Sequence, residues 1–284
     1  MLYLTFYQVP MTELKRAFRQ IRFLAALLLA NFLFVPVLLA VMLPLFPADP
    51  LLRLGMLMVL LCPCIDYVVT FSHLGKADAR LLLAATPVLL LVQMLLLPGY
   101  LNIFLGHGVS QGVSAAPFVH AFIWLIAIPL ALAALTQAAL AAAKRNRAVH
   151  LATQVSALLG VLPVPATALV LFIVVAAVIP QLGLALPTVW KILPVYVVFA
   201  LVAPVLGWMA ARLLRLAPAE GRALAFSAGT RNSLVVLPLV LAIPGALPLL
   251  PAVVLAQTLV ELVAELLYIR VIPMLGGKPI KLNG

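Results

Sequence analysis

Charged residues are scarce in this sequence, and acidic residues are the scarcest. Asp, Glu, Lys and Arg together make up 9% of the 284 residues, whereas hydrophobic residues make up 66%. About a quarter of a soluble domain is charged, so the composition excludes an ordinary soluble protein. Because helices satisfy their own backbone groups inside a bilayer, we predict an all-α polytopic membrane protein with a single transmembrane domain over residues 1–284.

Cysteine and histidine are also rare. The two cysteines, Cys62 and Cys64, lie two positions apart, which disfavours a disulfide between them. The four histidines are scattered, so the sequence has no cluster of the kind that binds zinc. An intramembrane enzyme would need a constellation such as paired aspartates or HExxH, and neither occurs. We therefore expect neither enzymatic activity nor a cofactor.

Basic residues alternate between successive connections of the chain. We predict eight spans of about twenty or more residues each, at 22–46, 52–72, 79–105, 117–143, 151–179, 189–212, 222–243 and 250–273. Lysine and arginine gather in every second connection, namely 10–22, 73–80, 144–150, 212–222 and the C-terminal tail. The net charge of +11 therefore reflects the membrane topology, and we expect no nucleic-acid partner. The positive-inside rule predicts a cytoplasmic C-terminus, in a multi-pass protein of the plasma membrane, which in a bacterium is the inner membrane.

The chain is predicted to consist of two inverted repeats. Pro36 and Pro204 lie at corresponding places within spans, and an interrupted span follows each. Because an odd number of spans offsets the two copies, they face opposite ways, as in many secondary carriers. The repeats cover about 1–106 and 117–275. Repeat 1 is incomplete, because segment 1–9 is too short to cross a bilayer, and we expect the first span and most of the second to be missing.

Each repeat contains one span that polar and helix-breaking residues interrupt. The first interruption is Leu61–Asp66, where Pro63 disrupts the preceding turn, and the second is Ser227–Ser233. Paired interruptions indicate the substrate site of a transporter. We expect the substrate to contact five residues of the two interruptions: Cys64, Asp66, Arg231, Asn232 and Ser233. The structural alternatives are an ion pair between Asp66 and Arg231 and, for Cys62, the role of a small apolar residue.

Gln257, Glu261 and Glu265 are spaced four residues apart, on one face of the last predicted span. A charge at membrane depth is costly and therefore indicates function. We expect a functional role for Glu261, whose carboxyl group can gain and lose a proton, with Gln257 and, in repeat 1, Gln93 as supporting polar groups. For Glu265, a pair with Arg270 or a position at the lipid interface is the alternative.

Four motifs give the chain a resemblance to the bile acid/arsenite/riboflavin transporter superfamily over nearly its whole length. Pro63-Cys64, Leu259-Val260-Glu261 and Ser227–Asn232 are similar to motifs of the arsenite efflux permeases, and Leu74–Asp78 is similar to a superfamily motif. The resemblance implies a bile acid:sodium symporter-like fold, with panel and core domains and two broken helices that cross. It also implies efflux of arsenite or antimonite, with the Cys64 thiolate as the metalloid ligand and Glu261 in proton coupling. A soft thiolate suits a thiophilic metalloid.

The sequence departs from the sodium-coupled bile acid members at both breaks. Val68 and Val69 replace their Ser-Asn, and Ser227 and Arg231 replace their glutamate and glutamine. Arg231 places a positive charge where a sodium ion would sit, so protons rather than sodium are the expected coupling ion. Leu234 stands where the arsenite permeases carry a glutamate.

The expected partners are a small inorganic or organic solute and the lipid bilayer. Transport of an organic anion, with Arg231 gripping a carboxylate or sulfonate, is the alternative to metalloid efflux. Loss of activity in a Cys64→Ala variant would favour metalloid efflux, and tolerance would favour the organic anion. A non-transporting sensor or assembly subunit is a further interpretation.

Overall fold

The computed structural model describes residues 2–7, 20–65, 67–106, 123–145, 154, 162–241, 243 and 249–277. This part of the chain is almost entirely helical, and its only strand-like feature is one isolated bridge. Four of its helical stretches are long and apolar enough to cross a membrane: Ile21–Leu45, Ala79–Leu105, Pro187–Leu213 and Leu249–Met274. The prediction of an all-α polytopic membrane protein is confirmed.

The first long span contains a π-helical turn at its centre. Three elements follow one another without a break, namely α3 (Ile21–Leu29), η1 (Ala30–Phe34) and α4 (Val35–Met42). Pro36 has no N–H, so the carbonyl of Phe32 lacks its helical donor. The hydroxyl of Tyr100, from α7 (Ala79–Leu105), donates to that carbonyl instead. Asn31 lies in the π turn, the kind of irregularity that is frequent at functional sites.

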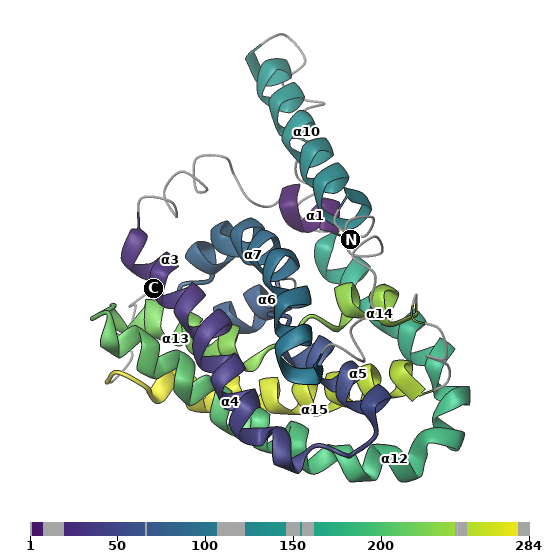
Figure 1. The fold of residues 1–284 in the computed structure, drawn as a ribbon. Helices are drawn as coiled ribbons and strands as arrows, with labels where there is room; N and C mark the ends of the chain where they lie inside the picture. Colours follow the sequence, from purple (N-terminus) through teal and green to yellow (C-terminus); the bar gives the residue numbers. More distant parts are fainter. Residues whose placement is uncertain are drawn as a thin grey trace.

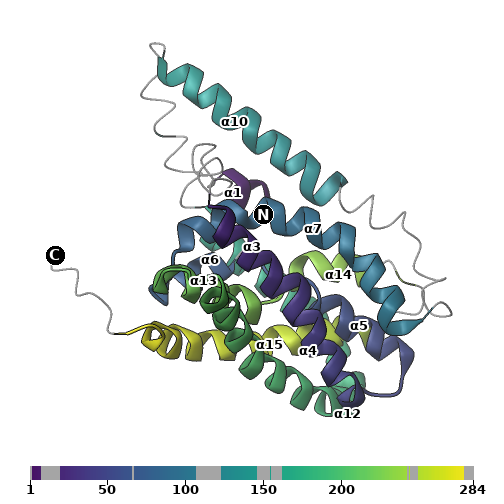
Figure 2. The same cartoon turned by 60° about the vertical axis from the view of Figure 1, so that its left-hand side comes forward.

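Two spans are interrupted, as the sequence predicts. The first consists of α5 (Pro50–Leu60) and α6 (Tyr67–Leu74), and the second of α13 (Pro218–Gly229) and α14 (Ser233–Leu241). Each half-helix is shorter than the roughly 20 residues that a span needs. Figures 1 and 2 show these four helices enclosed by α3 and α4, α7, α12 (Pro163–Leu213) and α15 (Leu249–Val271). The interruptions therefore lie in the interior of the bundle.

The connection predicted at 180–188 is wrong. Helix α12 runs from Pro163 to Leu213 without interruption, through Pro180 and Pro187. Proline is tolerated inside membrane helices, because neighbouring groups satisfy the carbonyls that it leaves free. The ribbon of α12 changes direction at the right of Figure 1, so a bend separates its two parts. Segment 180–188 contains two prolines and no charge, and this pattern was wrongly interpreted as a loop.

Helices α1 (Leu2–Tyr7) and α10 (Ile128–Arg145) pack against each other, and α10 projects from the rest of the bundle (Figures 1 and 2). The hydroxyl of Tyr3 donates to Thr136 Oγ1 at 3.0 Å. A π-helical turn, η3 (Ile123–Ala127), precedes α10. The predicted spans 117–143 and 151–179 begin in residues outside the described part of the chain.

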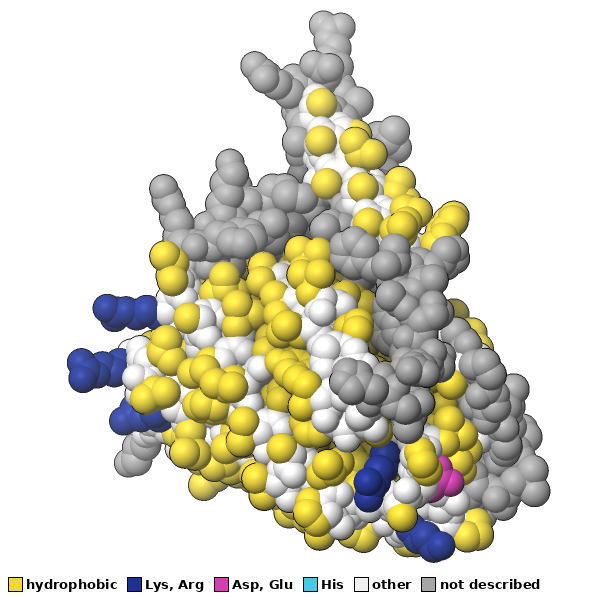
Figure 3. All heavy atoms as spheres, viewed as in Figure 1, with side chains coloured by type: hydrophobic (Ala, Val, Ile, Leu, Met, Phe, Trp, Pro, Cys, Tyr) yellow, Lys and Arg dark blue, Asp and Glu magenta, His cyan; other side chains and the backbone are white. Residues whose placement is uncertain are grey.

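The surface of the molecule is mostly apolar. Figure 3 shows hydrophobic side chains over most of the visible face, with lysine and arginine confined to its left edge and lower right. Large apolar side chains are widely exposed; Leu95, for example, is 79% exposed. Such an extended apolar surface is typical of a membrane or protein contact and agrees with a bilayer location.

Helices α12 and α13 make the most extensive contact among the described elements, and Gly207 allows it. A Cβ at position 207 would lie 2.4 Å from the carbonyl oxygen of Leu224 and 2.8 Å from Cβ of Ala228. We expect Gly207→Ala to reduce the free energy of unfolding by about 1–3 kcal/mol, because the backbone must shift. Gly99→Ala, with nothing within 4 Å of its Cβ, is the matched control. Equal melting temperatures of both variants in detergent would contradict the prediction.

Candidate functional site

The two interruptions pair with each other through their backbones. The N–H of Cys64 donates to the carbonyl of Thr230 at 3.0 Å, and the N–H of Asn232 donates to the carbonyl of Cys62 at 2.8 Å. These contacts form an antiparallel bridge between Pro63 and Arg231. An unpaired backbone group in the hydrocarbon core costs several kcal/mol. Each break therefore satisfies groups that the other leaves free, which holds the two broken helices at a common crossing.

The Arg231 guanidinium is fully buried beside this crossing, with 0% exposure. Its Nη2 donates to the carbonyls of Ser227 at 2.8 Å and Ala228 at 2.5 Å, and to Asn31 Oδ1 at 3.0 Å. Its Nη1 donates to the carbonyl of Leu60 at 3.2 Å. We call these four oxygens and the guanidinium that they surround the arginine cage.

The arginine cage supplies hydrogen-bond donors and positive charge to the C-terminal ends of two half-helices. Leu60 is the last residue of α5, and Ser227 and Ala228 lie in the last turn of α13. Carbonyls there lack helical donors and carry the partial negative charge of a helix C-terminus. The Phe199 ring of α12 completes the surroundings, with its centroid 5.4 Å from Cζ of Arg231. Arg231 Nε is the guanidinium nitrogen that has no hydrogen-bond partner.

Glu261 lies on the other side of the same backbone segment. Its Oε1 accepts from the Tyr67 hydroxyl at 2.5 Å. Its Oε2 accepts from the Arg231 backbone N–H at 2.6 Å and from Gln257 Nε2 at 2.5 Å. Three donors from α6, the second break and α15 thus converge on one buried carboxyl group that is 2% exposed. Any change in its charge would act on all three elements.

Glu265 has a different environment, one turn further along α15. Its Oε1 contacts the Thr230 hydroxyl, whereas its Oε2 is buried without a hydrogen-bond partner. The side chain is 0% exposed, and Arg270 is exposed to the outside. Glu265 therefore lies in the interior beside the second break, and the alternatives of an Arg270 pair or a lipid-interface position are wrong.

Small polar groups extend the cluster along α14 and α15. The side-chain Oδ1 of Asn232 accepts from the Val235 N–H at 3.1 Å, which caps α14, while Nδ2 of Asn232 is buried without a partner. The Ser233 hydroxyl donates to Gln257 Oε1 at 3.1 Å and accepts from Thr258 Oγ1 at 2.7 Å. An unpaired amide donor and a chain of hydroxyls give this region the capacity to bind a polar solute.

The structure brings most of the predicted residues to the crossing, as the backbone and side-chain contacts show: Cys64, Arg231, Asn232, Ser233, Gln257 and Glu261. Gln93 is buried in α7, and neither of its amide atoms has a hydrogen-bond partner. Asp66 lies outside the described residues, so its predicted pair with Arg231 lies outside them too.

Sequence reasoning did not single out Asn31, Tyr67, Thr230 or Thr258 as site residues. Tyr67 directly follows the first break and Thr230 lies within the second, and these positions were the available signal. Asn31 is the one amide of the first long span and precedes Pro36, which marks the irregular part of that helix. Tyr67, Thr230 and Asn31 have side-chain partners at least 35 residues away in the sequence, so no local pattern could predict these contacts.

The crossing is closed in this conformation. Cys64 is 0% exposed, Asn232 1% and Ser233 4%. A small molecule can contact these side chains only when the surrounding helices move. No group of three or more His, Cys, Asp or Glu side chains that could hold a metal ion occurs in the described ranges.

Comparison with known proteins gives one family match. The model of the Sodium Bile acid symporter family matches residues 1–186. This segment includes the first broken helix and Cys64, whereas the second break and Glu261 follow it. No curated protein matches the chain.

Proposed function

Because the chain belongs to the Sodium Bile acid symporter family, it is a secondary membrane transporter, and we propose that it exports arsenite or antimonite in exchange for protons. The observation that carries the proposal is the position of Cys64, a buried thiol in the first break whose backbone is bonded to the second. In transporters built from inverted repeats, such breaks hold the substrate.

The chemistry of Cys64 suits a metalloid hydroxide. A soft sulfur ligand favours a thiophilic centre over hard cations. When a thiol replaces one hydroxide of arsenite, a sulfur–arsenic bond forms and the thiol proton leaves with the hydroxide as water. Asn232 Nδ2 and the Ser233 hydroxyl are the nearby polar groups that we propose for the remaining hydroxides, with Gln257 and Gln93 as supporting groups. For Asp66 we propose contact with the substrate, because Asp66 lies in the first break of the sequence.

We assign coupling to Glu261 because its carboxyl group joins three elements that must separate when the crossing opens. A proton added to Glu261 removes an acceptor from one of these donors and weakens the connection. The arginine cage argues against sodium as the coupling ion. In broken-helix transporters, carbonyls at half-helix C-terminal ends coordinate sodium, and here those carbonyls already bind a guanidinium.

An organic anion bound by Arg231 is the alternative substrate. Three helix-end carbonyls and the Asn31 amide oxygen accept from Nη1 and Nη2, whereas Nε has no partner. Each helix-end carbonyl that a carboxylate displaced would be left unpaired, at a cost of about 1–3 kcal/mol. This cost favours a structural role for Arg231 over contact with the substrate. A sensor or assembly subunit is the third outcome that the experiment below distinguishes.

We further propose the membrane arrangement that the basic segments indicate. The protein is a multi-pass plasma-membrane carrier with a cytoplasmic C-terminus, built as one domain from repeats at about 1–106 and 117–275. The positive-inside rule supports this orientation. In a bacterium the location is the inner membrane.

The proposed function is tested by arsenite accumulation in cells that lack their own efflux system. Cells with the parent protein are expected to accumulate less arsenite than cells with an empty vector, and Cys64→Ala is expected to restore the vector level, because the soft ligand is lost. Cys62→Ala is the matched control, since this equally buried thiol is expected to be an apolar neighbour.

Other results of these assays would support a different function or a different site. Equal accumulation with parent and vector, when the protein reaches the membrane, contradicts metalloid efflux, and uptake assays with carboxylates and sulfonates then test the organic anion. Failure with these solutes as well favours the sensor or assembly subunit. Loss of efflux in both cysteine variants would indicate a site with two thiol ligands.

A further inference from the structure

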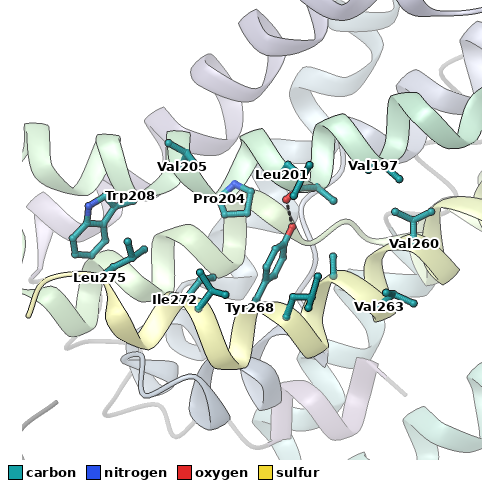
Figure 4. Close-up of a pocket in the computed structure, with 14 residues that line it drawn as sticks. Val197, Leu201, Pro204, Val205, Trp208, Val260, Val263, Tyr268, Ile272 and Leu275 are labelled. Atoms are coloured by element: carbon teal, nitrogen blue, oxygen red, sulfur yellow. Dashed lines mark hydrogen bonds between the residues drawn. The ribbon is translucent and has the colours of Figure 1, made fainter. Parts of the chain in front are cut away.

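An apolar groove lies between α12 and α15 on the outer face of the bundle. It has a volume of about 390 Å³, within the range of roughly 300–1,000 Å³ typical of ligand pockets. Figure 4 shows Val197 and Val260 at one end, and Trp208 and Leu275 at the other. Tyr268 lies between them, and its hydroxyl donates to a carbonyl of α12, so the only polar group of this side chain is satisfied within the protein. An occupant of the groove therefore meets an almost entirely apolar wall.

The groove opens toward the membrane. Leu201 and Val263, which line its two sides, are 64% and 63% exposed. Along α12 it extends from Val197 to Trp208, roughly 17 Å at about 1.5 Å per residue. One leaflet contributes about half of a hydrocarbon core that is roughly 30 Å thick. The groove thus has the length of one acyl chain in one leaflet.

Cationic side chains stand at the end of the groove that Trp208 marks. Arg212 lies in the last turn of α12, one turn beyond Trp208, and Arg270 lies in the last turn of α15, next to Val271 of the groove wall. Both arginines are exposed, and neither has a carboxylate partner within the described ranges. Tryptophan and arginine are the side chains that mark the headgroup level of a bilayer. An acyl chain in the groove would place its headgroup beside two unpaired cations.

We propose that this groove binds one anionic phospholipid, with an acyl chain along α12 and α15 and the phosphate beside Arg212 and Arg270. A zwitterionic lipid offers the same hydrocarbon but lacks the net negative charge that two cations favour. A second copy of this chain is a poorer occupant, because a two-fold contact through the groove would bring the arginines of both copies together. The proposal is independent of the transported solute.

The test uses Trp208 as the probe in reconstituted full-length protein. A parent form with Trp124→Phe and Trp190→Phe leaves Trp208 as its only tryptophan. It is placed in phosphatidylcholine vesicles that contain equal mole fractions of brominated phosphatidylglycerol or brominated phosphatidylcholine, whose bromines quench tryptophan on contact. We expect a higher relative association constant for phosphatidylglycerol, by roughly fivefold for each arginine. The double variant Arg212→Gln/Arg270→Gln is expected to bind both lipids equally.

Lys191→Gln is the matched control, because Lys191 is an exposed cation of the same helix beyond the opposite end of the groove. It is expected to keep the preference for phosphatidylglycerol. Equal quenching by both lipids in the parent form would overturn the proposal and indicate ordinary bilayer contact. A preference that persists in the double arginine variant would overturn the assignment of the headgroup site. The exposed positions of both arginines make these variants compatible with folding.

Discussion

Replacing Arg231 by alanine is expected to lower the free energy of unfolding by about 3–5 kcal/mol, the range for removing one partner of a buried charged interaction. The substitution leaves the carbonyls of Leu60, Ser227 and Ala228 and the amide oxygen of Asn31 without their donor. These oxygens then surround an empty space at two helix C-terminal ends. Transport is expected to be lost, because the crossing is no longer held in one geometry.

The same variant is expected to acquire a dependence on sodium. Oxygens at half-helix C-terminal ends are the ligands that coordinate sodium in broken-helix transporters, and an ion that binds only the folded state raises its stability. The measurement compares melting temperatures in sodium chloride and in choline chloride at equal ionic strength. The parent protein should melt at the same temperature in both salts, whereas Arg231→Ala should melt higher in sodium chloride.

Arg222→Ala is the control for this result. Arg222 is also buried and donates to two backbone carbonyls, those of Lys76 and Leu275, but it lies away from the crossing. Its removal is expected to destabilise the protein without a specific response to sodium. A stable Arg231→Ala protein, or equal recovery of both variants in sodium, would contradict the role of Arg231 as an internal replacement for a bound cation.

Replacing Glu261 by glutamine is expected to reduce proton-driven arsenite transport by at least roughly tenfold. The neutral amide cannot change its charge during the cycle, and its NH₂ group would face one of the donors that now converge on the carboxylate. A buried donor without an acceptor costs about 1–3 kcal/mol. In proteoliposomes with an imposed pH gradient, the initial rate should become independent of that gradient. Exchange of arsenite for arsenite without a gradient should persist.

Glu265→Gln separates coupling from the mere presence of a buried carboxyl group. Glu265 contacts the Thr230 hydroxyl through one oxygen, and its other oxygen has no partner, so an amide disturbs fewer contacts there. We expect this variant to retain transport that responds to the pH gradient. If Glu265→Gln abolishes the response and Glu261→Gln keeps it, the coupling group is Glu265.

Local sequence patterns were sufficient to predict the two interrupted spans and the polar face of the last span. Pro63 and the run of small polar residues before Ser233 weaken helices wherever they occur, and the breaks lie there. The four-residue spacing of Gln257 and Glu261 requires both to lie on one side of α15, and they bond to each other at 2.5 Å. The uncharged, proline-containing stretch 180–188 was ambiguous, because proline in a membrane helix permits either a loop or a bend.

The sequence by itself determined an all-helical membrane protein with two interrupted spans that carry a thiol, an arginine and a carboxyl group. Only the tertiary structure decided what each group contacts. The Arg231 guanidinium binds helix-end carbonyls 3, 4 and 171 residues away and the Asn31 amide oxygen 200 residues away, and Glu261 receives its donor Tyr67 from the other half of the chain. The physical reason is that burial strongly favours a hydrogen-bond partner for each polar group, while the identity of that partner depends on which backbone segments the fold brings together.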